Sequence, residues 1–163
     1  MTVEIEVAPH AVPAKSIEDI AKEATPKIAI LGVGGGGSNM VTWMDKKVIG
    51  ARTVALNSDA QHLTTSKAGS RVLLGYDLCG GLGCGGFPEQ GAKAAEESAH
   101  EIEQAIGDAN LVFVTSALGG GTGTGASPIV AKVARELGAL TIGVVTVSYT
   151  HLRAHETSLH LVC

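Results

Sequence analysis

The sequence predicts an α/β fold, a doubly wound and mostly parallel sheet covered by helices. Short apolar runs alternate with segments of helical periodicity between Lys27 and Val147. Hydrophobic residues make up 45% of the chain and aromatic residues only 3%, so the core must come mainly from Val, Ile, Leu and Ala, as in buried parallel strands. Two glycine-rich segments each follow an apolar run and precede a helix, an arrangement that suits phosphate binding.

Composition divides the chain into three parts, although 163 residues suit a single domain. Residues 1–26 hold three prolines around a short amphipathic segment and are predicted to form a flexible arm with a short helix. Residues 27–147 carry the strand and helix patterns. Residues 148–163 resemble translated adapter sequence, and we interpret them as a non-native tail. His155 and Glu156 begin like a zincin motif, but the next histidine falls one residue too late, so we predict no metal site there.

The first half of the domain is predicted to contain three strands. Residues 28–31 form a continuously apolar strand, and the glycines after it lead into a helix over 38–49, which Gly50 ends. The second and third strands are predicted at 53–56 and 71–74.

The second half is predicted to contain two longer helices and two strands. Pro88 begins the first helix and Gly107 ends it. Its apolar face comprises Ala92, Ala95, Ala99, Ile102 and Ile106, and its acidic residues form a solvated face. A strand at 111–114 leads to a helix beginning near Ser127, and a fifth strand spans 141–147. The buried face of that second helix is predicted to be Ile129, Val130, Val133, Ala134 and Leu137.

The predicted topology places the two glycine-rich segments together. If the first three strands are added in one direction and the last two in the other, the switch point falls between the first and fourth strands, where ligands bind in such sheets. The segments facing each other there are Gly34, Gly35, Gly36 and Gly37, and Gly119, Gly120, Gly121, Thr122, Gly123, Thr124 and Gly125. Neither contains the lysine of a Walker A motif, so backbone amides and a metal ion must meet the phosphate charge.

A different cofactor is the main alternative for the first segment. Gly32, Gly34 and Gly37 also fit G-x-G-x-x-G, and Asp59 follows at a distance that suits a ribose hydroxyl, as in an NAD-binding oxidoreductase. An NAD site of this kind would give the second glycine-rich segment, Gly119 to Gly125, no role. A third glycine cluster over 80–86 is predicted either to close over a terminal phosphate or to be a flexible approach to the helix at Pro88.

Charge and patterning argue against several classes of protein. The net charge is −4 with no basic cluster, which argues against nucleic-acid binding. No apolar run is long enough for direct membrane insertion and no signal peptide is visible, so we expect a cytoplasmic protein. Cys79, Cys84 and Cys163 include no CxxC pair and are expected to be reduced thiols.

Together these segments resemble the tubulin/FtsZ family, and within it the prokaryotic cell-division GTPases. The resemblance covers 27–147. It is carried by the GGGTGTG segment, by Gly34-Gly35-Gly36-Gly37-Ser38-Asn39, by Asn57-Ser58-Asp59-Ala60-Gln61, by Gly81-Leu82-Gly83-Cys84-Gly85 with Pro88, by Ala94-Ala95-Glu96-Glu97-Ser98 and by Gly138-Ala139-Leu140-Thr141. The sequence from Cys84 to Glu89 resembles archaeal members more than bacterial ones.

The resemblance implies binding of GTP with Mg²⁺, head-to-tail assembly into protofilaments, partners that anchor the filament at the division site, and a role in the division ring. The residues that it places at the nucleotide are Gly35 to Asn39, including Ser38, with Gly121, Thr122 and Gly123 on the phosphates. Cys84, Gly85 and Gly86 are expected to sense the γ-phosphate. Asn57 and Asp59 are expected near the magnesium and the terminal phosphate, Asp59 acting on the metal indirectly.

The sequence departs from the family pattern in three places. Gly80 stands where the family usually has a basic residue, and Ser38 replaces a glycine. The resemblance stops at Val147, after about the fifth strand, before the family's guanine-reading residues and second domain. The acidic loop that positions the attacking water belongs to that domain of the neighbouring subunit, so we predict no catalytic residue in this chain. A relative that keeps the fold without hydrolysing GTP is a further alternative.

Overall fold

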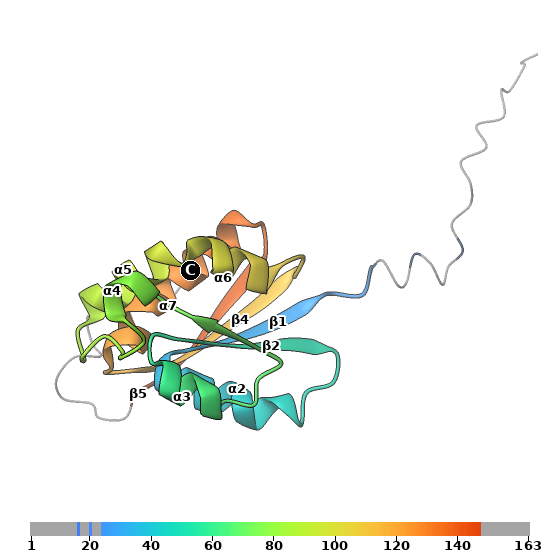
Figure 1. Ribbon diagram of the computed structural model, residues 1–163. Helices are drawn as coiled ribbons and strands as arrows, with labels where there is room; N and C mark the ends of the chain where they lie inside the picture. The colour runs from blue at the N-terminus through green and yellow to red at the C-terminus, as the bar shows by residue number, and fades with distance from the viewer. Residues whose placement is uncertain (1–15, 17–19, 21–23, 148–163) are drawn as a thin grey trace, which may run out of the picture.

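The computed structural model describes Ser16, Ile20 and residues 24–147. Its centre is one sheet of five parallel strands in the order β3-β2-β1-β4-β5 (Figure 1). The strands are β1 (Ile28–Val33), β2 (Ala51–Asn57), β3 (Ser70–Leu73), β4 (Leu111–Leu118) and β5 (Leu140–Val147). The α/β prediction and the switch point between β1 and β4 are therefore confirmed. The predictions for most of the N-terminal arm and for 148–163 lie outside the described residues.

Helices cover both faces of the sheet. They are α2 (Gly34–Asp45), α3 (Ala60–Thr65), α4 (Tyr76–Cys79), α5 (Pro88–Glu97), α6 (Ala99–Ile106) and α7 (Gly121–Glu136). Figure 1 shows α2 and α3 on one face, with α5, α6 and α7 on the other. None of the helices in the described residues is long and apolar enough to cross a membrane.

Alternation along β1 divides the core between the two faces. Ala29, Leu31 and Val33 belong to the larger cluster with α5, α6 and α7, whereas Ile30 packs with Val41 of α2 on the other face. Successive side chains of a strand point to opposite faces, so a central strand covered on both sides must be apolar throughout. This accounts for the uninterrupted apolar run at the start of the domain.

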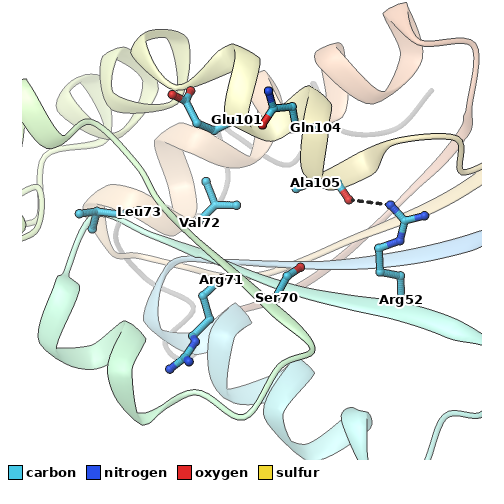
Figure 2. A pocket seen from close by; sticks show the side chains of 8 residues that line it. All are labelled: Arg52, Ser70, Arg71, Val72, Leu73, Glu101, Gln104 and Ala105. Carbon is cyan, nitrogen blue, oxygen red and sulfur yellow. Dashed lines mark hydrogen bonds between the residues drawn. The ribbon is translucent and has the colours of Figure 1, made fainter.

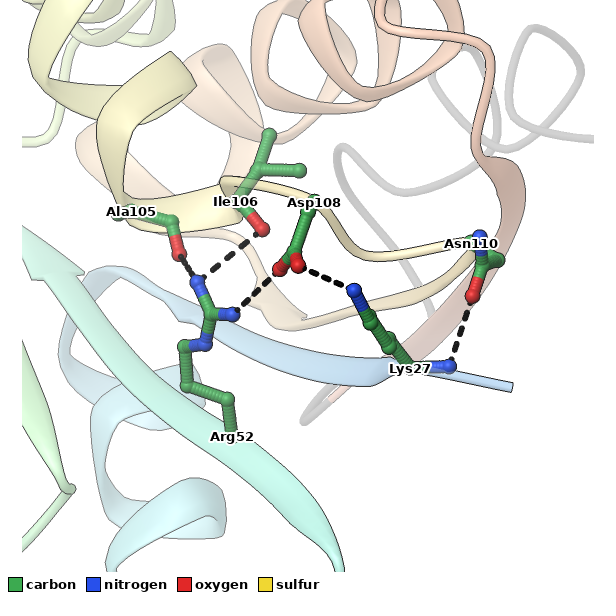
Figure 3. Close-up of polar contacts among 6 residues, drawn as sticks. All are labelled: Lys27, Arg52, Ala105, Ile106, Asp108 and Asn110. Carbon is green, nitrogen blue, oxygen red and sulfur yellow. Dashed lines mark hydrogen bonds and ion pairs between the residues drawn. The ribbon is translucent and has the colours of Figure 1, made fainter. Parts of the chain in front are cut away.

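Polar contacts fix the amino end of the sheet (Figure 3). Lys27, just before β1, places its Nζ 2.6 Å from Asp108 Oδ2, and Arg52 Nη2 lies 3.0 Å from Asp108 Oδ1. The backbone N–H of Lys27 donates to Asn110 Oδ1. The hydrogen bond from Lys27, followed by that from Arg52, lowers the pKa of Asp108. These contacts tie the starts of β1, β2 and β4 together.

The prediction that α2 and α7 begin after their glycines is wrong. α2 begins at Gly34 rather than near Ser38 and ends at Asp45, and α7 begins at Gly121 rather than near Ser127. The glycines therefore form the first turns of the helices. Glycine has low helix propensity, but propensity is a weak prior that tertiary packing overrides. The contacts responsible are described with the site below.

The predicted helix from Pro88 to Gly107 is two helices, α5 and α6, which meet at Ser98. Ser98 Oγ accepts a hydrogen bond from the backbone N–H of Gly75, 3.0 Å away. Its backbone, at φ −96° and ψ 25°, lies outside the usual helical values. The prediction that Leu137 lies on the buried face of α7 is also wrong. Leu137 follows the last turn of α7 and is 45% exposed.

β5 forms an edge of the sheet in the described residues and is apolar and exposed. Within residues 24–147 it pairs with β4 alone. Its exposed apolar side chains are Leu140, Ile142, Val144 and Val147. β5 is therefore an apolar edge strand of the described sheet, and an edge of this kind favours pairing with another strand.

Candidate functional site

Two helices begin side by side at the carboxyl end of the sheet with no cap of their own. α2 follows β1 directly, and α7 follows β4 after two glycines. The residues at the N-cap positions, Val33 and Gly120, make no side-chain hydrogen bond to the helix, and neither first turn contains an acidic residue. The first N–H groups of a helix lack intrahelical partners and carry partial positive charge. Both helix ends are thus suited to an anion.

The two helix ends touch at glycines. A Cβ on Gly34 would lie 2.6 Å from the backbone N of Gly123, and Gly34 has φ of +72°. A Cβ on Gly36 would collide with the Cβ of Ala117 in β4. These glycines permit the helix ends to approach each other and the sheet. In the structure Gly34 and Gly36 also serve close packing, a role that the sequence pattern did not reveal.

The glycines of α7 also set the contact with α5. A Cβ on Gly125 would collide with the carbonyl oxygen of Pro88, and one on Gly121 would lie 2.8 Å from the backbone N of Phe87. The N-terminal turns of α5 and α7 therefore pack backbone to backbone. Part of the GGGTGTG pattern is explained by this packing alone.

Other glycines of the predicted site face open space. Gly119 and Gly120, between β4 and α7, and Gly86, before α5, are exposed, and a Cβ on any of them would meet nothing within 4 Å. The N–H of Gly119 donates to Thr124 Oγ1 at 2.9 Å, which holds the turn. The space beside the start of α7 is thus bordered by backbone without side chains.

A buried chain of hydroxyl and thiol groups joins three segments of the site. Ser58 Oγ, after β2, lies 2.6 Å from Thr122 Oγ1 in α7. Cys84 Sγ, in the third glycine cluster, donates to Ser58 Oγ at 3.2 Å. Sequence reasoning gave Ser58 no role of its own. Its position between Asn57 and Asp59, two predicted site residues, could have indicated that Ser58 lies at the site.

The third glycine cluster is tied to the turn after β2. The N–H of Ala60 donates to Gly81 O at 2.9 Å, and that of Gly83 donates to Ser58 O at 3.1 Å. The predicted site residues Cys84, Gly85 and Gly86 are therefore brought to the start of α7. Cys84 is buried, whereas the two glycines are exposed.

Asn57 and Asp59 lie at the carboxyl end of β2 and the start of α3. Asp59 Oδ1 accepts from the backbone N–H of His62 at 2.9 Å and so caps α3. The buried Asn57 amide lies 3.4 Å from His62 Nδ1. His62 was not predicted, and its ring is 3.8 Å from where a Cβ on Gly35 would lie. The described residues contain no group of three His, Cys, Asp or Glu that would hold a metal.

Ser38 and Asn39 point in different directions. Ser38 belongs to the buried stripe of α2, with Gly34, Gly37 and Val41, and its Oγ has no hydrogen-bond partner in the described part of the chain. Asn39 is exposed. The Ser38 side chain therefore faces the core, and a ligand contact from this residue is left to its backbone.

A pocket of about 470 Å³ lies apart from these residues, between β3 and α6 (Figure 2). It is lined by Arg52, Ser70, Arg71, Val72, Leu73, Glu101, Gln104 and Ala105. The guanidinium of Arg52 is already used, since it donates to Ala105 O and pairs with Asp108. None of the predicted site residues lines this pocket.

Comparison with known proteins identifies relatives of the whole described domain. The family described as "Tubulin/FtsZ family, GTPase domain" matches residues 27–159. "Cell division protein FtsZ" of Helicobacter pylori is 50% identical over 135 residues, which cover 80% of this chain and 35% of that protein. "Cell division protein FtsZ 1" of Methanocaldococcus jannaschii is 45% identical over 147 residues, covering 90% of this chain and 40% of that protein. The chain thus spans well under half the length of these relatives.

Solved structures agree with the sequence matches. An empty FtsZ dimer from M. jannaschii superposes with a TM-score of 0.77 at 46% identity, over 81% of this chain and 39% of that one. A GTPγS-bound CetZ2 protofilament from Haloferax volcanii gives a TM-score of 0.65 at 28% identity, over 73% and 39%. Both are archaeal, whereas the H. pylori relative, which has the higher sequence identity, is bacterial.

Proposed function

Because the chain belongs to the tubulin/FtsZ family, we propose that it supplies the phosphate-binding half of the GTP site in a filament-forming, GTP-hydrolysing cell-division protein. The observation that carries the proposal is the pair of uncapped helix ends, α2 and α7, in contact at the switch point of the sheet. Membership of the family leaves the NAD alternative without support.

The residues present fit an anionic ligand. The first turns of α2 and α7 offer backbone N–H groups and partial positive charge, and a Cβ built on Gly86, Gly119 or Gly120 would meet no atom of the described residues within 4 Å. We propose that Gly34 to Asn39 and Gly119 to Gly125 hold the nucleotide through their backbone. Ser58, Thr122 and Cys84 keep the surrounding turns in place.

Mg²⁺ is proposed beside the terminal phosphates, near Asn57 and Asp59. Magnesium bound to a nucleotide usually takes phosphate oxygens, waters and one or two carboxylates, and it neutralises phosphate charge. Asp59 uses Oδ1 to cap α3. We propose that the same carboxylate acts on the metal indirectly, through its charge.

Hydrolysis and assembly are proposed for the whole protein. The relatives' names and titles describe cell division, a dimer and a protofilament. We propose that the whole protein assembles head to tail in the cytoplasm, is held at the division site by anchoring proteins, and completes its catalytic site at the contact between subunits. For these 163 residues alone we expect weak nucleotide binding and no turnover.

The test of phosphate binding uses the N-cap position of α7. Gly120 has extended backbone angles, φ −96° and ψ 166°, and open space around it, so it accepts a side chain. Asp and Asn are both good N-caps, and only Asp is charged. In Gly120→Asp the carboxylate stabilises the helix and repels phosphate, so we expect about a tenfold weaker affinity for GTP than in the matched Gly120→Asn.

The measurement is a titration of the ¹⁵N-labelled chain with GTP and Mg²⁺, which detects weak binding. Shifts should be concentrated in the first turns of α2 and α7, with NAD producing none there. Equal affinities of the two variants would show that phosphate does not approach α7. Phosphate release by the whole protein, with Asp59→Ala as control, separates an active GTPase from a non-hydrolysing relative.

A further inference from the structure

Two thiols face each other at the border of the site. Cys79, the last residue of α4, and Cys84 place their Sγ atoms 3.5 Å apart, and both are free cysteines. Cys84 holds Ser58 through its Sγ, as described above. Cys79 has no part in the proposed nucleotide site. The pair is close enough that a small movement would bring the two sulfur atoms to bonding distance.

The backbone between the thiols permits that movement. Gly80, Gly81 and Gly83 all have positive φ, and a Cβ on Gly80 would meet nothing within 4 Å. The turn is closed by a hydrogen bond from the N–H of Leu82 to Cys79 O. A disulfide has an S–S distance of about 2 Å, so the sulfur atoms need to approach by roughly 1.5 Å. Glycines absorb backbone changes of this kind at little steric cost.

We propose that Cys79 and Cys84 form a reversible intramolecular disulfide, which makes the connection between α4 and α5 sensitive to oxidation. With hydrogen peroxide, one thiolate attacks a peroxide oxygen, the O–O bond breaks, and hydroxide leaves to give a sulfenic acid. The second thiol then attacks that sulfur, the S–O bond breaks and the S–S bond forms. In total, two thiols are oxidised, one peroxide is reduced, and two waters are released.

The two cysteines differ in access to the oxidant. Cys84 is 3% exposed, whereas Cys79 is partly exposed and meets the oxidant first. Burial, followed by the hydrogen bond and charge of Cys84 and the charge of Glu97, raises the pKa of Cys79 to about 11. The thiolate is the reactive form, so oxidation is slow at neutral pH and becomes faster as the pH rises towards that value. The site therefore responds to sustained oxidation.

The disulfide changes the nucleotide site through Cys84. When Cys84 Sγ bonds to Cys79, it can no longer donate to Ser58 Oγ, which contacts Thr122 in α7. This consequence rests on the proposed function, whereas disulfide formation does not. We expect the oxidised chain to bind GTP about fivefold more weakly, the effect of losing one hydrogen bond.

The disulfide is tested by peptide mapping in the full chain carrying Cys163→Ser. After treatment with hydrogen peroxide and then N-ethylmaleimide, trypsin releases residues 72–93, which contain both cysteines and no internal cleavage site. We expect this peptide to carry no maleimide and to be lighter by two hydrogens, and dithiothreitol to restore both thiols. Cys79→Ser and Cys84→Ser should each prevent disulfide formation, so that the peptide does not lose two hydrogens. Two maleimide adducts, or sulfinic acid on Cys79 alone, would overturn the proposal.

The effect on the ligand is measured separately, by the ¹⁵N titration with GTP on oxidised and reduced chains. Equal affinities in the two forms would overturn the coupling to the nucleotide site. If neither form binds GTP while the disulfide forms, the proposed function fails for this chain and the disulfide stands. Hydrogen exchange of Gly81 and Gly83 gives a readout without nucleotide, and we expect it to slow on oxidation.

Discussion

Four helices begin at the carboxyl ends of strands, and they do so in two ways. α3 and α4, which follow β2 and β3, begin with their N–H groups bonded by carboxylates. Asp59 caps α3, and Glu97 accepts from the N–H groups of Asp77 and Leu78 in α4. α2 and α7, which follow β1 and β4, begin at glycines with no side-chain cap and no acidic residue. The difference follows the topology, because the uncapped pair flanks the switch point.

The fold bonds the first N–H groups of α3 and α4 with its own carboxylates, and it provides no side-chain cap for those of α2 and α7. Capping stabilises a helix by about 1 kcal/mol, so two uncapped ends are a cost to the folded state. A ligand that binds the free donors recovers that cost. The stability of the first turns of α2 and α7 should therefore respond to phosphate, while α3 and α4 should not.

The largest expected effect comes from the close contact that joins α7 to α5. Helix propensity alone would make Gly125→Ala stabilising by about 1 kcal/mol. The new Cβ would collide with Pro88 O, so we expect destabilisation of about 3 kcal/mol instead. Urea denaturation followed by circular dichroism measures the change, with Gly120→Ala as an unhindered control. A gain in stability would contradict the packing described here.

The next effect concerns the cap of α3. Asp59→Ala removes the acceptor for the His62 N–H and should lower the free energy of unfolding by about 1 kcal/mol. Asp59→Asn keeps a capping oxygen and removes the charge, so it should retain stability and weaken only Mg²⁺-dependent nucleotide binding. Thermal denaturation and the GTP titration separate these outcomes. Equal loss of stability in both variants would argue against the cap.

A smaller effect is expected at α4. Glu97→Gln keeps one acceptor oxygen and removes the charge that bonds two N–H groups, so we expect destabilisation of about 0.5 kcal/mol. The same change removes a cause of the raised pKa of Cys79, so its alkylation at fixed pH should become faster. Iodoacetamide kinetics followed by peptide mapping measure that rate. Unchanged kinetics would show that Glu97 does not act on the thiol.

The smallest effect lies at the opposite end of the sheet, where Asp108 pairs with Lys27 and Arg52. Its folded pKa is lowered, so the stability it contributes is present above the unfolded pKa and is lost as the pH falls through the folded value. Asp108→Asn should therefore melt slightly below the parent chain at pH 7, and the gap should narrow as the carboxylate of the parent chain is protonated in acid. Melting curves at low and high salt provide the check, because screening weakens an exposed pair. A gap that persists in acid would point to packing instead.

The sequence allowed the strands and their order to be predicted because buried parallel strands are continuously apolar and the two glycine segments fall on either side of a switch point. The starts of α2 and α7 could not be predicted, since the contacts of Gly36 with Ala117 and of Gly125 with Pro88 join residues far apart in the chain. The break at Ser98 has the same origin, because its partner Gly75 is 23 residues away. The motifs marked the candidate site, but Ser58 and His62 emerged only from side-chain contacts.

β5 gives the domain a gradient of local stability. Among residues 24–147, β1 has a hydrogen-bonded neighbour on each side and is buried along most of its length, whereas β5 has one such neighbour and is exposed along most of its length. Segments with few buried contacts open more often than the core does. The amides of β5 should therefore exchange with solvent well before those of β1. Local unfolding that begins at β5 must extend through β4 before it disturbs the first turns of α2 and α7.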